Sequence, residues 1–456
     1  MFSGIVSMKV QGGNLMGSLE QKIKAFVKEQ GVEVVGVAGP DHLEGPPSLD
    51  PTYTMQRARS IVSMALPMNV DAIYDFLGKK SPTPHGLDQI KINQKLFRIA
   101  TSLAEYINSL GYKAGAVPSN NTYRRSPDAF STHPSFSLRF GAIASGIGAQ
   151  GWSGNIMTRE YGAAIYLGTV VTDATLESDE PMHPRYFIDT FCKGCKLCER
   201  TCVAGMFESE REEYVLINKE LHPRGKRVSI DLCNVSCFGL HSLSRDKKWT
   251  TWGHRWIEDW VDHPPDALSK LRMRYILMRE GITAGDSTPR YDIIRRIGSL
   301  LWPEDLIEGY INKHPEHKRE SERARMLFDF AKQLGVRGLR DERILTCGQC
   351  AMVCGPTIDE TARRYKTLVE SGLVVPGPEG EMVNVPTYEE AVELRKKYLP
   401  KVTGAEKVKD AVASTVLWHR FYFGFEPKSM IQSIIYERKL KKAVQNRMRG
   451  HADSVN

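Results

Sequence analysis

The sequence predicts an α+β protein of more than one domain, and three observations support this. At 456 residues the chain is longer than a single hydrophobic core usually extends. Residues 1 to about 185 alternate helix-like and strand-like patterns. All nine cysteines lie beyond residue 191, and residues 361–456 have the pattern of a mostly helical, basic tail.

Two segments of the first part have the spacing of amphipathic helices. In residues 18–30 apolar and charged positions recur at helical spacing, and the pattern stops at Gly31. Residues 96–111 form a second such pattern, closed by Gly111. Several apolar or β-branched runs are typical of strands. They span residues 32–39, 58–68, 112–118 and 161–173.

The composition is that of an ordinary globular protein, with 41% hydrophobic and 25% charged residues. No run approaches the roughly 18 apolar residues of a membrane-spanning helix. The first residues show neither a basic export signal nor a twin-arginine pair, so we expect a cytoplasmic protein with reduced thiols. The net charge of +8 permits an anionic partner without requiring one.

Four cysteines form the run C-x2-C-x2-C-x3-C, which is typical of bacterial ferredoxins. They are Cys192, Cys195, Cys198 and Cys202. This spacing wraps a short loop around three corners of a cubane cluster, and the fourth cysteine binds the other cluster in two-cluster proteins. A second group follows as C-x2-C-x3-C. It consists of Cys347, Cys350 and Cys354.

Two [4Fe–4S] clusters need eight cysteines, and the missing ligand is either Cys233 or Cys237, which leaves one of these two spare. We expect one cluster on Cys192, Cys195, Cys198 and Cys354. We expect the other on Cys202, Cys347, Cys350 and one of the pair Cys233 and Cys237. Paired C-x2-C elements also fit zinc. Zinc would leave the third cysteine of each run idle, so the spacing favours iron–sulfur clusters.

The stretch "SGIGAQGWSGN", residues 145–155, contains a G-x-G-x-x-G motif. A nicotinamide-binding motif of this type follows a strand and opens a helix. Here the preceding residues 136–145 look helical and the following residues 161–173 look like a strand, so the order is reversed. The density of glycines still predicts a tight turn or a close approach of the backbone to another group.

The glycine stretch and the cysteines together resemble the cobalamin-dependent iron–sulfur reductases, which comprise epoxyqueuosine reductases and reductive dehalogenases. Members carry a similar glycine element, then an apolar strand ending in "TD", then the ferredoxin run. This chain reads "SGIGAQGWSGNIMTREYGAAIYLGTVVTDATL" before Cys192. The resemblance covers about residues 20–245 and 340–360.

The resemblance implies a nitroreductase-like cobalamin-binding domain at 1–187, fused to a ferredoxin-like domain with two [4Fe–4S] clusters at 188–245 and 341–360. The remaining parts are a helical insert at 246–340 and a helical, basic C-terminal region at 361–456. The resemblance also implies that the glycine loop packs on the corrin. Its residues are Gly146, Gly148, Gly151, Gly154 and Asn155.

Two residues are candidates for the proton donor. Epoxyqueuosine reductases have a D-T-G-P element, whereas this chain has "FSTHPSFSLR" there, with His133 and no carboxylate. His133 is a candidate acid near neutral pH, or a capping or packing residue. Reductive dehalogenases use a tyrosine near a lysine or arginine, and Tyr123, followed by Arg124, is the second candidate. A solvated basic turn is the alternative interpretation.

Two further patterns lie outside the resemblance. Trp249, Trp252, Trp256 and Trp260 have the spacing of one helix stripe, which predicts a helix packed on the ferredoxin domain, or a lid or docking face. The segment 421–450 carries aromatic residues followed by a run of basic ones. It predicts a solvated basic helix, or a contact with tRNA or an anionic membrane surface.

The sequence therefore predicts a cytoplasmic, metal-binding oxidoreductase in which electrons pass through two [4Fe–4S] clusters to cobalamin, which reduces a small organic substrate. Its donor would be a ferredoxin, a flavodoxin or another low-potential protein. One alternative is an electron-transfer or adaptor protein that has lost the corrinoid. The other is a tRNA-modifying reductase of the epoxyqueuosine type.

Overall fold

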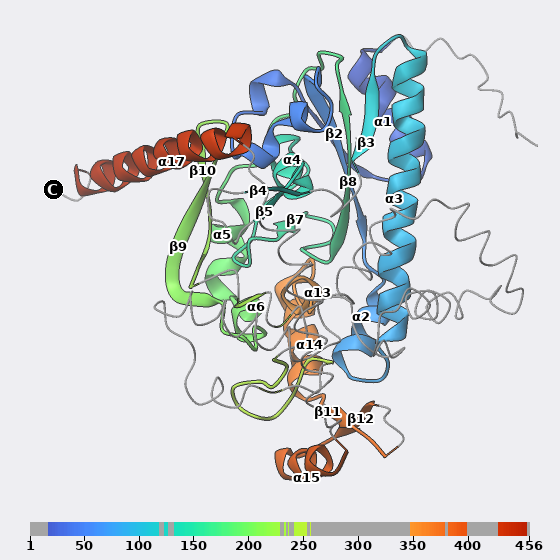
Figure 1. Ribbon diagram of the computed structural model, residues 1–456, viewed down its shortest axis with the longest axis vertical. Coiled ribbons are helices and arrows are strands. Elements are labelled where there is room, and N and C mark those ends of the chain that lie inside the picture. Colours follow the sequence, from blue (N-terminus) through green and yellow to red (C-terminus); the bar gives the residue numbers. More distant parts are fainter. Residues whose placement is uncertain are drawn as a thin grey trace, which may run out of the picture.

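The structure is a computed structural model (Figure 1). It describes residues 17–117, 123–125, 132–228, 232–233, 236, 241–252, 256, 347–378, 382–398 and 427–453. The described part is a mixed α and β protein, as predicted. That its domains are nitroreductase-like and ferredoxin-like remains a prediction.

A four-stranded sheet organises the first part of the chain. Its strand order is β1 (Val34–Ala38), β2 (Ser60–Pro67), β8 (Ile165–Thr172) and β3 (Ala114–Val117), and every neighbouring pair is antiparallel. All four strands fall within the predicted runs. Because nicotinamide-binding folds of the Rossmann type have a parallel sheet, this topology excludes that interpretation of the glycine motif.

Helices α1 (Leu19–Glu29) and α3 (Thr83–Ser109) pack on one face of the sheet (Figure 1). Ser18 caps α1, since its hydroxyl accepts from the Gln21 N–H while the Gln21 side chain accepts from the Ser18 N–H. Helix α3 confirms the helix predicted at 96–111, but it begins earlier, at Thr83. Apolar side chains from α1, α3 and the sheet form one buried core. They include Ile23, Val27, Val62, Met64, Leu103 and Val170.

Helix α4 (Leu138–Ala144) covers the other face and leads into the glycine loop. Its buried residues Ile143 and Ala144 join Ile61 and Val171 of the sheet in a second core. The predicted order, with the helix before the glycines and the strand after them, is confirmed. The smaller elements of this part are η1 (Pro40–His42), η2 (Pro47–Leu49), η3 (Pro51–Tyr53), α2 (Val70–Leu77), the ribbon of β4 (Tyr123–Arg125) and β5 (Thr132–Pro134), and the pair β6 (Ala149–Gln150) and β7 (Ile156–Met157).

The cysteine-bearing segments lie beside this sheet. One group of elements runs from α5 (Tyr186–Thr190) through η4 (Cys192–Gly194) and α6 (Leu197–Arg200) to the hairpin of β9 (Phe207–Ile217) and β10 (Glu220–Arg227). The other includes α13 (Gln349–Met352) and α14 (Ile358–Val369), followed by the hairpin of β11 (Leu373–Pro376) and β12 (Met382–Val385) and by α15 (Tyr388–Tyr398). Figure 1 shows α15 and this hairpin at the end of the molecule away from α1. The hairpin interrupts the tail that was predicted as mostly helical.

The prediction that the tryptophan stripe forms one helix is wrong for residues 249–252, which the structure describes. Residues 249–252 are not helical, because their backbone bonds go to other segments: Thr251 N–H donates to the Ser242 carbonyl, and Thr250 N–H donates to the Gly372 carbonyl. Trp249 and Trp252 are instead buried in a core with α2, α13, α14 and β11. Trp260 and most of the predicted insert lie outside the described residues.

The last helix, α17 (Pro427–Asp453), confirms a basic helix at the end of the chain and crosses the β9–β10 hairpin (Figure 1). The Leu216 N–H donates to the Tyr436 hydroxyl at 3.0 Å, and Lys439 pairs with Glu44 at 2.6 Å. No helix in the described parts of the chain has the length and hydropathy needed to cross a membrane.

Candidate functional site

The two cysteine groups have the same local conformation. In the elements Cys195-x2-Cys198 and Cys347-x2-Cys350 the residue after the first cysteine is left-handed, Lys196 at φ +48° and Gly348 at φ +57°, and a one-turn helix follows. That helix is α6 in the first group and α13 in the second, and the two helices are in contact. This conformation turns the chain sharply, so that successive cysteines of one run face the same side.

The first set of thiols comprises Cys192, Cys195, Cys198 and Cys354. Three of them are buried in one core with Trp152, Phe187 and Ile188. Burial raises the pKa of the Cys198 thiol well above its usual value, and the nearby charges of Cys354 and Cys192 raise it further. Cys354 belongs to the second cysteine group along the chain and nevertheless lies near the cysteines of the first run.

The second set comprises Cys202, Cys233, Cys347 and Cys350. Burial raises the pKa of the Cys202 thiol to about 12, a hydrogen bond from the Met206 N–H opposes this, and the charges of Cys233 and Cys350 add to it. Burial likewise raises the pKa of Cys347, whose charged neighbours are the other three members of the set. Cys237 lies outside the described residues. The structure thus places Cys233 with three thiols of the second set, and which of Cys233 and Cys237 is the ligand remains a prediction.

Both sets consist of thiols, which are the ligands that iron–sulfur clusters use. Among the described residues, no three cysteine, histidine or acidic side chains could hold a single metal ion. Metal coordination requires these thiols to lose their protons, so binding of a cluster to buried thiols with raised pKa values would release protons.

The glycine loop, residues 146–155, contacts both sets of cysteines. The Trp152 N–H donates to the Cys192 sulfur at 3.3 Å, and the Asn155 side-chain amide donates to the Cys350 sulfur at 3.3 Å. Trp152 and Asn155 are buried, with 3% and 8% of their surface exposed. The sequence marked Asn155 as a corrin contact but gave no signal that it would meet a cysteine.

Protein atoms account for the glycines in this loop. A side chain at Gly148 would lie 2.5 Å from the Met157 carbonyl oxygen, and one at Gly151 would lie 2.5 Å from the Met157 sulfur. Gly146 and Gly154 have φ values of +71° and +73°, which glycine adopts without strain. A side chain at Gly154 would also lie 2.3 Å from the Arg227 guanidinium. A corrin contact of these residues remains a prediction.

Two buried cations lie near the second set, and the sequence did not point to either. Lys79 is 5% exposed and donates to the Leu77 carbonyl at 3.1 Å. Burial lowers its pKa to about 7, although the charge of Cys347 acts to raise it. Arg227 donates to the Ser153 carbonyl at 3.1 Å, and burial lowers its pKa to about 10. Both place positive charge where reduced clusters would carry negative charge.

One polar group of the glycine loop is buried with both its atoms unsatisfied. The Gln150 side chain is 1% exposed, and neither its amide nitrogen nor its oxygen has a hydrogen-bond partner among the described residues. Such a group usually binds water or a polar ligand. The unpaired amide of Gln150 is therefore compatible with a cofactor that carries amide groups beside this loop.

The two candidate acids lie on the same ribbon. Tyr123 of β4 faces Pro134 of β5 across the ladder, and Arg124 faces His133. Tyr123 and His133 are therefore diagonal neighbours on the ladder, at positions that alternate between its two faces. Their roles as proton donors remain predictions.

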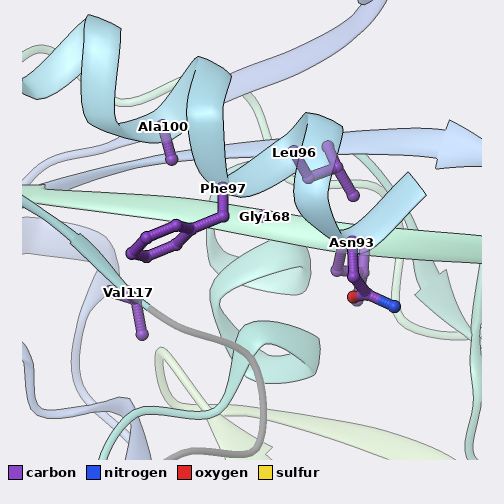
Figure 2. Close-up of a pocket in the computed structure, with 7 residues that line it drawn as sticks. Asn93, Leu96, Phe97, Ala100, Val117 and Gly168 are labelled. Atoms are coloured by element: carbon purple, nitrogen blue, oxygen red, sulfur yellow. The ribbon is translucent and has the colours of Figure 1, made fainter. Parts of the chain in front are cut away.

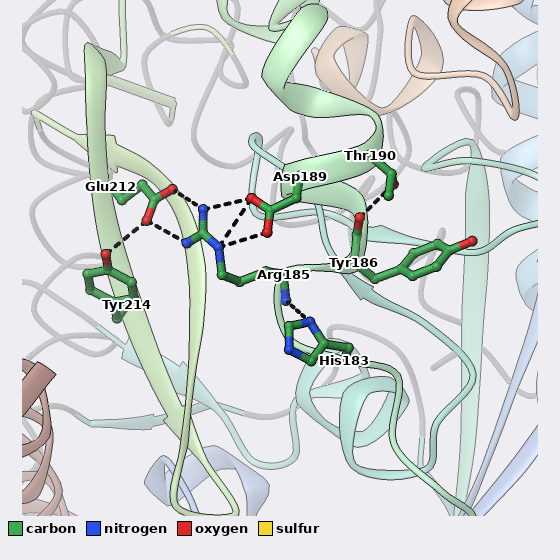
Figure 3. A network of polar contacts seen from close by, with 7 residues as sticks. All are labelled: His183, Arg185, Tyr186, Asp189, Thr190, Glu212 and Tyr214. Carbon is green, nitrogen blue, oxygen red and sulfur yellow. Dashed lines mark hydrogen bonds and ion pairs between the residues drawn. The ribbon is translucent and has the colours of Figure 1, made fainter. Parts of the chain in front are cut away.

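An ion-pair network secures the helix that precedes the cysteine run (Figure 3). The Arg185 guanidinium contacts Asp189 of α5 at 2.9 Å and Glu212 of β9 at 3.0 Å, and the Tyr214 hydroxyl donates to Glu212 at 2.8 Å. The hydrogen bond to Glu212 raises the pKa of Arg185 above its usual value. The network ties α5 to the hairpin and so fixes where the chain enters the cysteine loop.

A small pocket lies apart from the cysteines, between α3, β3 and β8 (Figure 2). Its volume is about 10 Å³, which is roughly the space of one water. Leu96, Phe97 and Val117 are among its lining residues. Neither a corrin nor an organic substrate fits into it in this form.

Comparison with curated proteins confirms the resemblance to both branches of the reductase family. The chain is 26% identical over 187 residues to a tetrachloroethene reductive dehalogenase of Dehalobacter restrictus, and the matched stretch covers 41% of this chain and 29% of that protein. It is 24% identical over 163 residues to an epoxyqueuosine reductase of Atelocyanobacterium thalassa, and the matched stretch covers 35% of this chain and 46% of that protein. The matches thus span less than half of either relative. No protein-family model matches the chain.

Solved structures of both types are also similar. A reductive dehalogenase described with a mechanism for B12-dependent dehalogenation is 14% identical, with a TM-score of 0.35, covering 64% of this chain and 39% of that one. An epoxyqueuosine reductase solved with a tRNA stem loop is 13% identical, with a TM-score of 0.36, covering 93% of this chain and 99% of that one.

Proposed function

We propose that this chain is an iron–sulfur and cobalamin-dependent reductase that acts on a small organic substrate in the cytoplasm. The observation that carries the proposal is the gathering of eight thiols into two sets of four, from segments about 150 residues apart along the chain. Each set draws members from both groups, as expected for two [4Fe–4S] clusters. A ferredoxin or flavodoxin is the expected class of electron donor.

The residues of this chain would hold the clusters, keep water away and deliver a proton. The thiols of both sets bind iron, while backbone N–H groups and the Asn155 amide donate to their sulfurs. The glycine loop and Gln150 would hold the corrinoid. When bound, cobalamin supplies a cobalt centre that acts as a strong nucleophile or binds a substrate halogen. His133 or Tyr123 would protonate the product.

Metal content tests this proposal. The protein is purified without oxygen, reconstituted with iron, sulfide and cobalamin, and analysed for iron and cobalt per chain. We expect about eight irons, as two [4Fe–4S] clusters require, and about one cobalt. About eight irons without cobalt would contradict the corrinoid chemistry and favour an electron-transfer or adaptor protein. Binding of zinc in place of iron would contradict the whole proposal.

A second candidate is a tRNA-modifying reductase, and helix α17 is the observation that favours it. Its inner side is fixed to the β9–β10 hairpin through Tyr436, while its outer side exposes a row of basic residues. They are Arg438, Lys441, Lys442 and Arg449. The epoxyqueuosine reductase with a tRNA stem loop makes tRNA the partner to test.

Binding of unmodified tRNA at several salt concentrations tests this candidate. We expect affinity to fall steeply with salt, and the combined change Arg438→Gln, Lys441→Gln and Lys442→Gln to weaken binding and flatten the salt dependence. Lys396→Gln, on the exposed side of α15, is the matched control. Equal binding by the triple variant and the native protein would rule out α17 as an RNA surface. Binding to anionic vesicles instead would assign the helix to a membrane surface, a use that the exposed Ile431 and Ile435 also suit.

A further inference from the structure

The glycine loop connects the two sets of thiols through hydrogen bonds of different kinds. On Cys192 the donor is the backbone N–H of Trp152, whereas on Cys350 it is the side-chain amide of Asn155. Cys192 belongs to the first set and Cys350 to the second. Only the bond to Cys350 can be removed by replacing a side chain, so Asn155 is the residue of this loop whose effect on a sulfur is open to selection and to experiment.

The surroundings hold the Asn155 side chain in place. The Asn155 backbone N–H donates to the Ser153 hydroxyl at 3.2 Å, and the Ser153 carbonyl accepts from the Arg227 guanidinium at 3.1 Å. Arg227 reaches that carbonyl because Gly154 has no side chain to block it. The left-handed Gly154 then turns the chain so that Asn155 points at Cys350. Three consecutive residues thus serve to aim one amide at one sulfur.

The same neighbourhood is positive. Burial and the Cys233 charge raise the pKa of the Cys350 thiol, and the Asn155 amide and the charges of Arg139 and Arg227 oppose this rise. Arg227 also carries a buried Nε with no hydrogen-bond partner among the described residues. A donor or a positive charge near a cluster favours the reduced state, which has one more negative charge, and therefore raises the reduction potential.

We propose that Asn155 is a tuning residue that raises the reduction potential of the cluster bound through Cys350, while leaving the cluster bound through Cys192 unchanged. This inference rests on the proposed function, since it presumes that both thiol sets hold clusters. It gives the glycine motif a role in electron transfer that is separate from any contact with the corrin. The loop would then set the potential at which one of the two clusters accepts its electron.

A redox titration of the reconstituted protein, followed by electron paramagnetic resonance, tests the proposal. Asn155→Asp removes the amide donor and adds a negative charge at nearly constant shape, and Asn155→Ser removes the amide without adding charge. We expect one midpoint to fall in both variants and the other to stay. For Asn155→Asp the reduced-to-oxidised ratio at the native midpoint should drop at least tenfold, which is about 59 mV for one electron.

The matched control is Asn384→Asp, which makes the same chemical change in β12, where the amide donates to the Ser371 carbonyl and to no cysteine. It should leave both midpoints unchanged. Unchanged midpoints in both Asn155 variants, with iron content equal to that of the native protein, would overturn the proposal. So would an equal shift of both midpoints.

The titration also separates this inference from the proposed function. Failure of the native protein to bind about eight irons would contradict the clusters themselves, and the inference would fall with them. Native iron without cobalt would contradict only the corrinoid chemistry, and the titration would still decide the role of Asn155.

Discussion

Cys233 lies near the thiols of Cys202, Cys347 and Cys350, and this placement makes it the candidate ligand to test against Cys237. We expect Cys233→Ser to remove about four of the eight irons, because one cluster loses a ligand, and Cys237→Ser to leave the iron content unchanged. Chemical iron analysis of both variants after identical reconstitution provides the measurement. The reverse result would assign the ligand to Cys237.

His85 makes the stability of the protein depend on pH. It is 5% exposed in α3, its ring meets the Phe76 ring edge-on at 4.8 Å, and burial lowers its pKa to about 4. An unfolded histidine has a pKa of about 6.5. Between pH 6.5 and 4 the unfolded chain therefore binds one more proton than the folded chain does at this site, so stability is lost as pH falls through this window.

The variant His85→Gln has no such proton to bind. Relative to the native protein it should lose less stability between pH 7 and pH 4, by at most about 3 kcal/mol from the difference in pKa. Thermal unfolding at a series of pH values gives the comparison. His222 and His241, whose pKa values burial also lowers to about 4, keep part of the dependence in both proteins. An identical loss in the variant and the native protein would show that His85 does not contribute.

At the scale of elements, the turn before β8 supports the second cysteine group. Gly162 closes a bridge with Thr158, and the next residue, Ala163, donates its N–H to the Cys354 carbonyl at 3.0 Å. A side chain at Gly162 would lie 2.2 Å from the Gly355 carbonyl oxygen, and the φ of +64° disfavours any other residue. We expect Gly162→Ala to displace the Cys354 loop.

The variant Gly162→Ala should therefore lower the thermal midpoint and reduce the iron content by up to the four atoms of the cluster that uses Cys354. Gly86→Ala in α3 is the matched control, because a side chain there would meet no atom within 4 Å. In a helix this change should stabilise by about 0.5–1 kcal/mol. Full iron content in Gly162→Ala would contradict the role of the turn.

How far the elements could be predicted depends on where their partners lie. The strands of the sheet and the cores of α1 and α4 follow from short-range periodicity, and so they agree with the prediction. Helix α3 begins at Thr83 rather than near residue 96, since its first turns pack on α2 as well as on the sheet. Trp249 and Trp252 have helical spacing, but the residues between them form backbone hydrogen bonds with distant segments, such as that of Thr250 with Gly372. The periodicity of a sequence gives no information about such long-range hydrogen bonds.

The same reasoning applies to the candidate site. The C-x2-C spacing fixes which cysteines act together within a run, and it led to the expected exchange of Cys202 and Cys354 between sets. The hydrogen bond from Asn155 to Cys350, and the charge interaction between Lys79 and Cys347, join residues about 195 and 270 positions apart. No local pattern marks such contacts, because they depend on how the sheet and the cysteine segments are placed against each other.

At the scale of the whole molecule, two kinds of core meet. The sheet and its helices have cores without cysteine, built from residues such as Val62 and Leu103 on one face and Ile61 and Ile143 on the other. The core beside them combines Cys192, Cys198 and Cys354 with apolar side chains such as Trp152 and Phe187. The first kind is stabilised by burial alone, whereas the second needs its thiols to be bound or protonated.

Removal of iron should therefore affect the two parts unequally. After treatment with an iron chelator, we expect backbone amides of α3, β2 and β8 to keep their protection against hydrogen exchange, because no side chain of the sheet cores binds metal. Amides of 192–207 and 347–354 should lose protection, because buried thiols without iron lack the bonds that offset the chain entropy of their loops. Hydrogen exchange with mass spectrometry on the loaded and chelated forms measures both regions in one sample. Equal loss of protection in the sheet would show that the clusters stabilise the whole chain as one cooperative unit. Retained protection in both cysteine segments would show instead that the thiol sets are preformed before iron binds.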